Sequence, residues 1–433
     1  MSDLLDMKVF FLLITSTFLS LAINLEVFAS GGFSDTRFSG FATVGFARGG
    51  NQQVGLRQNV TYHGEYANWS HKTDSLVGVQ ASSRWNEQWG SAIQLVFRDR
   101  VGESFEDNIT WAYLRFNPTS SVSLRAGRMG ADLFMLSEYR NTGFAYLWVR
   151  PPIEFYGFIG FEHYEGLDVS YKLPLGVGML SAKLMLGKSS QQLVNDDLDI
   201  NFKVDPAYGF NLRWETDSVR LHFSHSELSF DSSAAEEFRI DELLDALTLA
   251  QTFGWSELGP IINSLDIDNK SIAYTSVGFA YDVTPWVMQT EIAYIASDFD
   301  VFKPYLNYYF SAGYKVGDFT FYSMVARAEN TKDPNQAPVA PNIPVIPGFP
   351  SEQIQAVVDE FSSSIQSFYV AVSIEQTTYS VGTRWNLRHN TALKFQWDCT
   401  FIDAVGKNLW ETKSRLHEDQ RVNTYSINLD FVF

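Results

Sequence analysis

The chain ends with the stretch VNTYSINLDFVF, which spans Val422–Phe433. Apolar and polar side chains alternate along it: Tyr425, Ile427, Leu429, Phe431 and Phe433 share one parity, and Thr424, Ser426, Asn428 and Asp430 share the other. This two-residue period is typical of a β-strand with one apolar and one polar face. In a soluble protein it would leave an aromatic strand edge exposed to water. Between lipid and enclosed water it is stable, so it predicts the closing strand of a transmembrane β-barrel.

Similar alternating segments recur along the chain and are separated by short turns and long loops in alternation. They are Phe38–Ala47, Ser75–Trp85, Gly90–Arg98, Ile109–Phe116, Val122–Arg128, Leu167–Leu173, Met179–Gly187, Tyr208–Glu215, Val219–Ser226, Ile272–Val283, Trp286–Ile295, Tyr305–Val316, Phe319–Arg327, Tyr379–Leu387 and Ala392–Phe401. With the closing strand, we predict an antiparallel up-and-down barrel of about sixteen strands. Two further alternating runs, Leu56–Tyr62 and Tyr369–Gln376, leave eighteen strands as the alternative.

The predicted strands place apolar side chains outside and polar side chains inside. Outward positions include Ile93, Leu114, Leu184, Leu212, Phe310 and Phe395. Inward positions include Gln80, Gln94, Asn211, Ser224, Asn307 and Gln396, and the cations Lys183 and Arg213. Aromatic residues also gather beside the short turns, among them Trp85, Phe116, Trp214, Trp286, Tyr314 and Trp385. Rings at one level are typical of the interfacial girdle of a membrane barrel, whereas a soluble sandwich gives no reason for them to collect there.

The N-terminus and the composition define the cellular setting. Residues 9–22 are nearly all apolar or small, and Val27-Phe28-Ala29 resembles a signal-peptidase site. We therefore expect a cleaved signal peptide at 1–29, starting at Met1 or Met7, followed by a single barrel domain at 30–433. The formal net charge of −18 argues against a nucleic-acid partner. The single cysteine excludes an intrachain disulfide and a cysteine-based metal site.

Three long connections carry further signals. We expect loop 3 at 129–166, loop 5 at 230–270 and loop 7 at 330–368. Loop 5 contains the helical spacing of Glu237–Phe253, and loop 7 contains a proline-rich stretch followed by a helix that Ser351 caps. We expect these two amphipathic helices to pack on each other or on the rim of the barrel.

These features resemble the porins of Gram-negative outer membranes. The shared features are Phe38-Ser39-Gly40-Phe41, Arg125-Ala126-Gly127-Arg128, the long loop that follows them and the terminal Phe433. The resemblance implies a water-filled channel for small hydrophilic solutes and ions, narrowed by loop 3 folded into the lumen. Loop 3 departs from the plain loop of that family at Val149–Glu154, a stiff and charged stretch that we expect to impose a defined constriction. The resemblance also implies a homotrimer in contact with outer-membrane lipid and lipopolysaccharide, assembled by machinery that reads Phe433, with no cofactor and no enzymatic activity.

Charged residues on the inward faces and on loop 3 predict the pore chemistry. The expected constriction and lumen residues are Arg84, Arg98, Arg115, Arg125, Arg384 and Lys394 on the wall, facing Asp132, Glu138 and Glu154 on loop 3. Arginine keeps its positive charge at any physiological pH, so opposed acids would set a transverse field across the pore. The other possibility is that most of these residues are solvated or form rim ion pairs.

Two other functional classes remain open from the residues alone. A substrate-specific channel or a surface-binding adhesin barrel would use the long external loops as its binding site. A barrel-wall hydrolase would use His222 and Ser224, although such polar pairs on a lumen face are usually only solvated. The acidic runs at 196–199, 266–269 and 298–300 lack the spacing and glycine of an EF-hand, so we predict no metal site.

Overall fold

The computed structural model describes residues 35–433 with several gaps. Residues outside the description are 1–34, 101–103, 159–161, 196–197, 232–240, 253–257, 300–301, 333–351, 353–354, 357, 361, 364, 367–371, 408 and 414–415. The predicted signal peptide at 1–29 and the proline-rich part of loop 7 therefore lie outside the described residues. The description covers all of the predicted wall strands apart from single short gaps.

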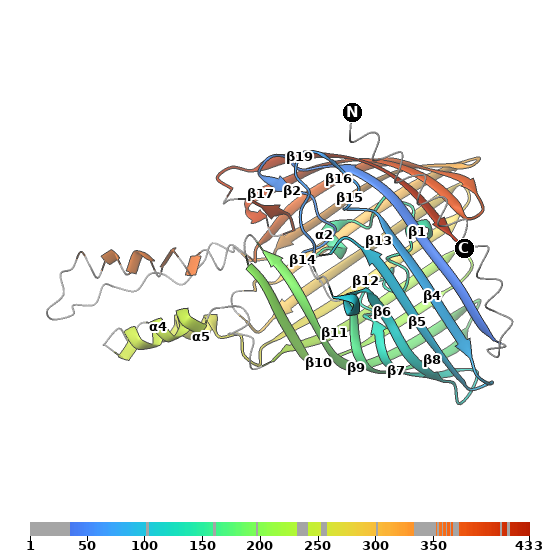
Figure 1. The fold of residues 1–433 in the computed structure, drawn as a ribbon, viewed down its shortest axis with the longest axis horizontal. Coiled ribbons are helices and arrows are strands. Elements are labelled where there is room, and N and C mark those ends of the chain that lie inside the picture. The colour runs from blue at the N-terminus through green and yellow to red at the C-terminus, as the bar shows by residue number, and fades with distance from the viewer. Residues whose placement is uncertain are drawn as a thin grey trace.

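Sixteen antiparallel strands close into one barrel (Figure 1). They are β1 (Thr36–Arg48), β4 (Leu76–Arg84), β5 (Trp89–Arg98), β6 (Ile109–Phe116), β7 (Val122–Gly130), β8 (His163–Leu175), β9 (Gly178–Asn195), β10 (Leu198–Glu215), β11 (Val219–Phe230), β12 (Ser271–Val283), β13 (Trp286–Ser297), β14 (Tyr305–Val316), β15 (Phe319–Asn330), β16 (Ile374–Arg388), β17 (Thr391–Lys407) and β19 (Gln420–Val432). Each strand pairs with its neighbours in the chain, and β1 closes the sheet against β19. The predicted fold class is confirmed, with sixteen strands rather than eighteen.

The closing contact joins the two ends of the sheet at one level. The backbone N–H of Phe433 donates to the Gly40 carbonyl at 3.0 Å, and Gly40 donates back at 2.9 Å. A Cβ atom at Gly40 would lie 2.2 Å from the Phe433 ring and 2.9 Å from the Gly78 carbonyl, so only glycine fits. The terminal strand therefore completes the wall, and no edge of the sixteen-strand wall is left open.

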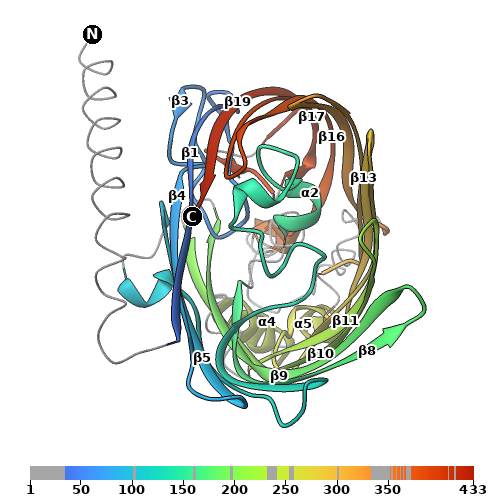
Figure 2. The same cartoon turned by 90° about the vertical axis from the view of Figure 1, so that its right-hand side faces the viewer.

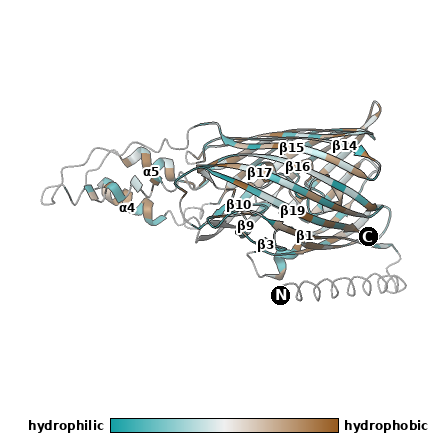
Figure 3. Cartoon of the chain, turned by 90° about the horizontal axis from the view of Figure 1, so that it is seen from above, coloured by the Kyte–Doolittle hydropathy of each residue, from teal (hydrophilic) through white to brown (hydrophobic). Residues whose placement is uncertain are grey.

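The barrel has an apolar outer face and a polar inner face. Outward Phe310, Phe395 and Leu184 are exposed, while inward Asn307, Gln396 and Asn211 are buried. Teal hydrophilic and brown hydrophobic bands alternate along the strands in Figure 3. Bulky side chains on the outside and polar side chains inside are what lipid on one side and an enclosed interior on the other require.

Aromatic rings meet across neighbouring strands beside the short turns. Trp89 lies opposite Phe116 with ring centroids 4.7 Å apart. Two further such pairs are Trp286 with Tyr314 at 4.9 Å and Phe319 with Trp385 at 5.3 Å. The predicted girdle is therefore built from cross-strand pairs at the end of the barrel where the turns lie.

The two extra alternating runs do not add wall strands. The first run follows directly after β2 (Val54–Gly55), which pairs with β18 (Glu411–Thr412), and its first residue Leu56 forms an isolated bridge with Glu65. The described part of the second run joins β16, which begins at Ile374. A two-residue strand β3 (Trp69–Ser70) adds to the edge of β1.

The helices lie in the long connections between strands. They are η1 (Phe105–Asn108), η2 (Gly143–Ala145), α2 (Ile153–Tyr156), α4 (Asp241–Thr252) and α5 (Gly259–Leu265). In loop 5, α4 contacts α5, and both lie beyond the barrel at its long-loop end (Figure 1). The described residues between 352 and 366 in loop 7 are also helical, with Val358 and Ile365 buried. Among the described residues, no helix has both the length and the apolar character needed to cross a bilayer.

Candidate functional site: the lumen and loop 3

Loop 3, the connection between β7 and β8 at 131–162, enters the barrel instead of remaining outside (Figure 2). Its helix α2 contacts β13, β14, β15 and β16, and its turn η2 contacts β1 and β19. All residues from Ala131 to Ser137 are buried, as are Trp148, Val149 and Arg150. The loop therefore packs against the inner wall over much of its length, as predicted for a third loop folded into the lumen.

Aromatic side chains fill the space between loop 3 and the wall strands β12–β14. Phe134 contacts Tyr274 edge-on at 5.4 Å, and Phe155 contacts Tyr309 at 5.3 Å. Trp148 is 1% exposed, packs edge-on against Tyr309, and donates its indole N–H to Ser311 at 2.7 Å. Buried aromatic contacts of this kind stabilise both partners, so this part of the interior is a packed core and not open water.

Two buried cations fasten loop 3 to β17 and β19. Lys394 donates to the carbonyls of Gly143 and Trp148 at 2.6 and 2.7 Å and pairs with Asp430 at 2.9 Å. Arg150, on the loop itself, donates to Ser426 on β19 at 2.6 Å and to both carboxylate oxygens of Asp74, which precedes β4, at 2.9 and 2.6 Å. Breaking a buried pair by removing one partner costs about 3–5 kcal/mol, so these contacts hold the loop firmly.

Two buried carboxyl groups attach loop 3 to β13 and β16. Glu291 on β13 accepts a hydrogen bond from the backbone N–H of Met135 at 2.9 Å and another from the hydroxyl of Tyr156. Glu154 on α2 accepts from Gln376 at 2.6 Å and from Thr378. Burial raises the pKa of Glu154 to about 7, because the neighbouring hydrogen bonds only partly offset the loss of water.

Loop 1, which connects β1 to β4, and loop 8, which connects β17 to β19, cover the same half of the lumen at its long-loop end. The strands β2 and β18 pair across the two loops, and Glu411 accepts from the backbone N–H of Gly64 at 2.7 Å. Arg57, buried in loop 1, donates to the Leu409 carbonyl at 3.2 Å. The backbone N–H of Val60, also in loop 1, donates to the Gly157 carbonyl of loop 3 at 3.1 Å. The half of the lumen beside β13–β19 is therefore covered by loops 1 and 8 at the long-loop end and filled by loop 3 inside the barrel.

The wall beside β4–β8 has a different character. Inward polar and aromatic side chains remain half-buried there: Gln80, Ser82, Trp111, Tyr113, Arg115, Ser123, Arg125 and Ser170. Their counterparts on the opposite wall are buried beneath loop 3, with Gln376, Ser380, Asp398 and Asn428 all under 9% exposed. Solvent thus reaches the inner wall on one side of the barrel, and this side is the candidate route for solutes.

A belt of five cations runs along the inner wall from β6 to β11. We call it the cation belt, and it consists of Arg115, Arg125, Lys183, Arg213 and Arg220 on β6, β7, β9, β10 and β11. Arg115 lies directly opposite Arg125 in the strand register. Arg125 forms an ion pair with Asp168 at 2.6 Å, whereas Arg115 forms no ion pair with any of the described residues. Like charges opposite each other destabilise a sheet, so the placement of Arg115 opposite Arg125 lowers stability while it concentrates positive charge on the inner wall.

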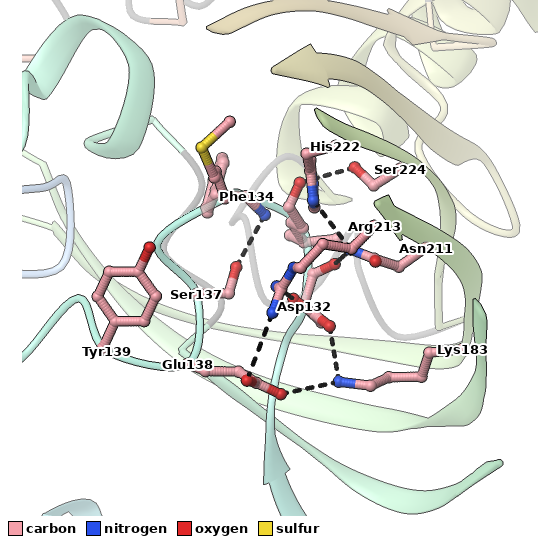
Figure 4. Close-up of polar contacts among 12 residues, drawn as sticks. Asp132, Phe134, Ser137, Glu138, Tyr139, Lys183, Asn211, Arg213, His222 and Ser224 are labelled. Atoms are coloured by element: carbon pink, nitrogen blue, oxygen red, sulfur yellow. Dashed lines mark hydrogen bonds and ion pairs between the residues drawn. The ribbon is translucent and has the colours of Figure 1, made fainter. Parts of the chain in front are cut away.

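Loop 3 presents two acids to the cation belt (Figure 4). Asp132 contacts Lys183 at 2.6 Å and Arg213 at 3.5 Å, and Glu138 contacts the same two cations at 3.1 and 3.6 Å. Burial alone would raise the pKa of Asp132, but Lys183 and Arg213 outweigh burial and lower it to about 2. Lys183 likewise lowers the pKa of Glu138, more strongly than its partial burial raises it. Both acids are therefore ionised at neutral pH.

The expected pairing of wall cations with loop acids differs from the contacts in the structure. Arg84 pairs with Asp35 near the short turns, and Arg98 lies 4.0 Å from Glu162 near the long loops. Arg384 donates to two backbone carbonyls of loop 3. Neither Arg125 nor Lys394 contacts a loop 3 acid, since each pairs with an acid of a neighbouring strand. None of these five cations contacts Asp132, Glu138 or Glu154, so their opposition across the pore stays a prediction. All of them except the exposed Arg84 are at least partly buried within the barrel.

Glu154 also differs from the expectation. It faces the neutral groups of Gln376 and Thr378 and forms no ion pair with any described residue, so it serves as a buried attachment. The sequence hypothesis missed Lys183 and Arg213 as the partners of the loop acids, although both had been placed on the inward face. It also missed Glu162, on which Arg98, Arg100 and Arg140 converge. Burial alone would raise the pKa of Glu162, but these arginines together lower it.

The other chemical possibilities are not supported by the arrangement of the side chains. Ser224 donates to the Leu133 carbonyl at 2.7 Å, and His222 contacts the Asn211 amide at 3.4 Å (Figure 4). Both side chains are buried beneath loop 3 and are occupied with structural contacts. Within the described parts of the chain, no group of three or more His, Cys, Asp or Glu residues is placed to hold a metal ion.

Comparison with known proteins defines the class of the fold. No protein-family model matches the chain, and no curated protein matches its sequence. The outer membrane channel DcaP of Acinetobacter baumannii shares the fold with a TM-score of 0.52 and 12% identity, over 92% of this chain and 97% of that chain. OmpF of Salmonella typhi, solved in a complex with daunomycin, matches with a TM-score of 0.51 and 10% identity, over 92% and 97% of the two chains. The chain therefore has the porin type of barrel fold.

Proposed function

We propose that the chain is an outer-membrane porin of a Gram-negative cell, through which small hydrophilic solutes and ions diffuse passively. The observation that carries the proposal is the polar, half-buried wall of β4–β8 beside a loop 3 that is fastened to the opposite wall. A through-route lined on one side by β4–β8 and on the other by loop 3 is narrower than the barrel. Loop 3 then sets the constriction, without a cofactor and without catalytic turnover.

The cation belt gives the route a preference for anions. The preference rests on Arg115, which forms no ion pair with any described residue, because Lys183 and Arg213 are balanced by the ionised Asp132 and Glu138. Fixed positive charges in a narrow, partly desolvated passage attract anions and repel cations more strongly than the same charges in open water. The apolar outer face suits membrane lipid and lipopolysaccharide, and the aromatic end of β19 suits recognition of Phe433 by the barrel-assembly machinery.

Reversal potentials in a salt gradient test this proposal. The refolded protein in a planar bilayer should conduct with a preference for anions. Arg115→Gln should move the reversal potential toward that of a non-selective pore, because it removes a charge without leaving an acid unpaired. Arg48→Gln is the matched control, since Arg48 is exposed at the outer end of β1. A strong cation preference that Arg115→Gln does not change would contradict the anion route, and absence of current would contradict the channel.

A second candidate is a surface-binding barrel or substrate-specific channel. It is favoured by the helices α4 and α5, which lie beyond the barrel end and would present a large external surface (Figure 1). Conductance that increases linearly with salt supports the general pore. Conductance that saturates, or that one solute blocks at low concentration, supports the substrate-specific channel.

A further inference from the structure

Beneath loop 3, a recess of about 560 Å³ opens at the end of the barrel where the short turns lie. Its roof is loop 3, including Leu136, Tyr146 and Leu147, and its walls are the turn-proximal parts of β11–β16. Leu136 and Tyr146 are buried, and the packed core of Trp148 and Tyr309 lies beyond them. The recess therefore ends at a closed roof on the filled half of the lumen, and it adjoins the proposed solute route at Arg220 of the cation belt.

The recess combines aromatic rings with cations. The Arg384 guanidinium lies over the Phe144 ring at 4.7 Å, and the Arg220 guanidinium lies over the Tyr139 ring at 5.9 Å. Both Phe144 and Tyr139 are half-buried, so part of each side chain is open to the recess. A flat apolar group can lie against these rings while a neighbouring anion reaches a guanidinium.

Of the three cations that line the recess, Arg384 forms no ion pair with any described residue. Lys315 pairs with Asp282, and Arg220 pairs with Glu215 at 3.3 Å. Arg384 donates only to the Phe144 and Tyr146 carbonyls, at 2.8 and 2.9 Å, and to the Asn386 side chain at 2.9 Å. It forms no ion pair with any described residue, and Asp430 acts on it electrostatically without contact, so a ligand carboxylate would form the first direct ion pair with this guanidinium.

We propose that this recess binds small aromatic monoanions, with an aromatic carboxylate such as benzoate as the simplest ligand. The ring lies against Phe144 and Leu147, and the carboxylate accepts hydrogen bonds from Arg384. A volume of this size holds such a molecule with room for bound water. The recess opens toward the short turns, so the ligand enters from the periplasmic side if the proposed outer-membrane orientation holds. Binding itself does not depend on that orientation or on conduction.

Isothermal titration of the refolded barrel in detergent tests the proposal with three probes of matched size or charge. Benzoate should bind, whereas acetate lacks the ring and benzyl alcohol lacks the charge, so each should bind at least about tenfold more weakly. Equal affinity for benzoate and acetate, or for benzoate and benzyl alcohol, would overturn the proposal. This comparison needs only the wild-type protein.

Two variants locate the site. Arg384→Gln should weaken benzoate binding by roughly tenfold or more, and Lys172→Gln, a charge change at the same barrel end on β8, should not. Ala280→Trp fills the recess without changing charge and should abolish binding, which decides the question even if Arg384→Gln does not fold. Unchanged binding in Ala280→Trp would place the ligand elsewhere. A barrel that conducts but does not bind benzoate contradicts the recess alone, and one that binds but does not conduct contradicts only the proposed channel.

Discussion

At Glu154, the burial of one carboxyl group links the docking of loop 3 to pH. An undocked Glu154 ionises near its ordinary pKa of 4.5, whereas the docked residue stays protonated up to about 7. As pH rises from 4.5 to 7, the undocked state loses its proton first and is favoured, so docking weakens over this range and is constant above it. A shift of this size corresponds to roughly 3 kcal/mol as an upper bound.

We therefore predict that the α2 region of loop 3 is better protected at pH 5 than at pH 8. Amide hydrogen exchange of residues 149–158, corrected for intrinsic pH dependence, measures this directly. Glu154→Gln keeps the size and the hydrogen-bonding capacity of the side chain but cannot ionise, so its protection should be the same at both pH values. Equal protection of the wild-type protein at the two pH values would show that Glu154 does not control docking.

At this scale, the sequence predicted which charges point inward but not which charges meet. Inward placement follows from strand parity, and it correctly placed Lys183 and Arg213 on the lumen face. Their contact with Asp132 depends on the path of loop 3, which has no period from which it could be predicted. The role of Glu154 was missed for the same reason, because only the docked loop removes it from water.

At the scale of elements, strand ends beside the short turns were predicted closely and the opposite ends were not. The bounds of β6 and β14 are those expected from alternation. The strands β9 and β10 extend well past their predicted ends toward the long loops, to Asn195 and from Leu198. Beyond the lipid both faces of a strand meet water, so the alternation on which the prediction depends is lost although the backbone pairing continues.

Loop 3, as an element, divides the inner wall into an accessible and an inaccessible side, and cysteine scanning checks this division. In a Cys399→Ser background, Ser82→Cys and Ser123→Cys lie on the accessible wall, while Ser380→Cys and Ser426→Cys are 2% and 5% exposed beneath loop 3. We expect a charged methanethiosulfonate reagent to reduce the current through the first pair only. Reduction by modification at Ser380→Cys and Ser426→Cys would mean that solutes pass on the filled side.

At the scale of the whole molecule, the exposed apolar belt surrounds a barrel whose interior loop 3 fills on one side. The resemblance to porins implies that three such barrels associate. We predict a trimer in mild detergent, measured by size-exclusion chromatography with multi-angle light scattering and corrected for bound detergent. Heating in SDS should release monomers that still migrate as folded barrels before they unfold. A monomer at all detergent concentrations would contradict the homotrimer.

The attachment of loop 3 to β9–β19 has a consequence for the cell that carries this protein. Under the proposed function, the size limit for entering molecules is set by a handful of buried contacts, such as Lys394 with the Gly143 carbonyl and Arg150 with Asp74, and not by the circumference of the cylinder. A bacterium that lost one of these contacts would keep an intact envelope protein of the same width. It would nevertheless admit bulkier toxic compounds, so drug sensitivity can change through positions that no permeating molecule ever touches.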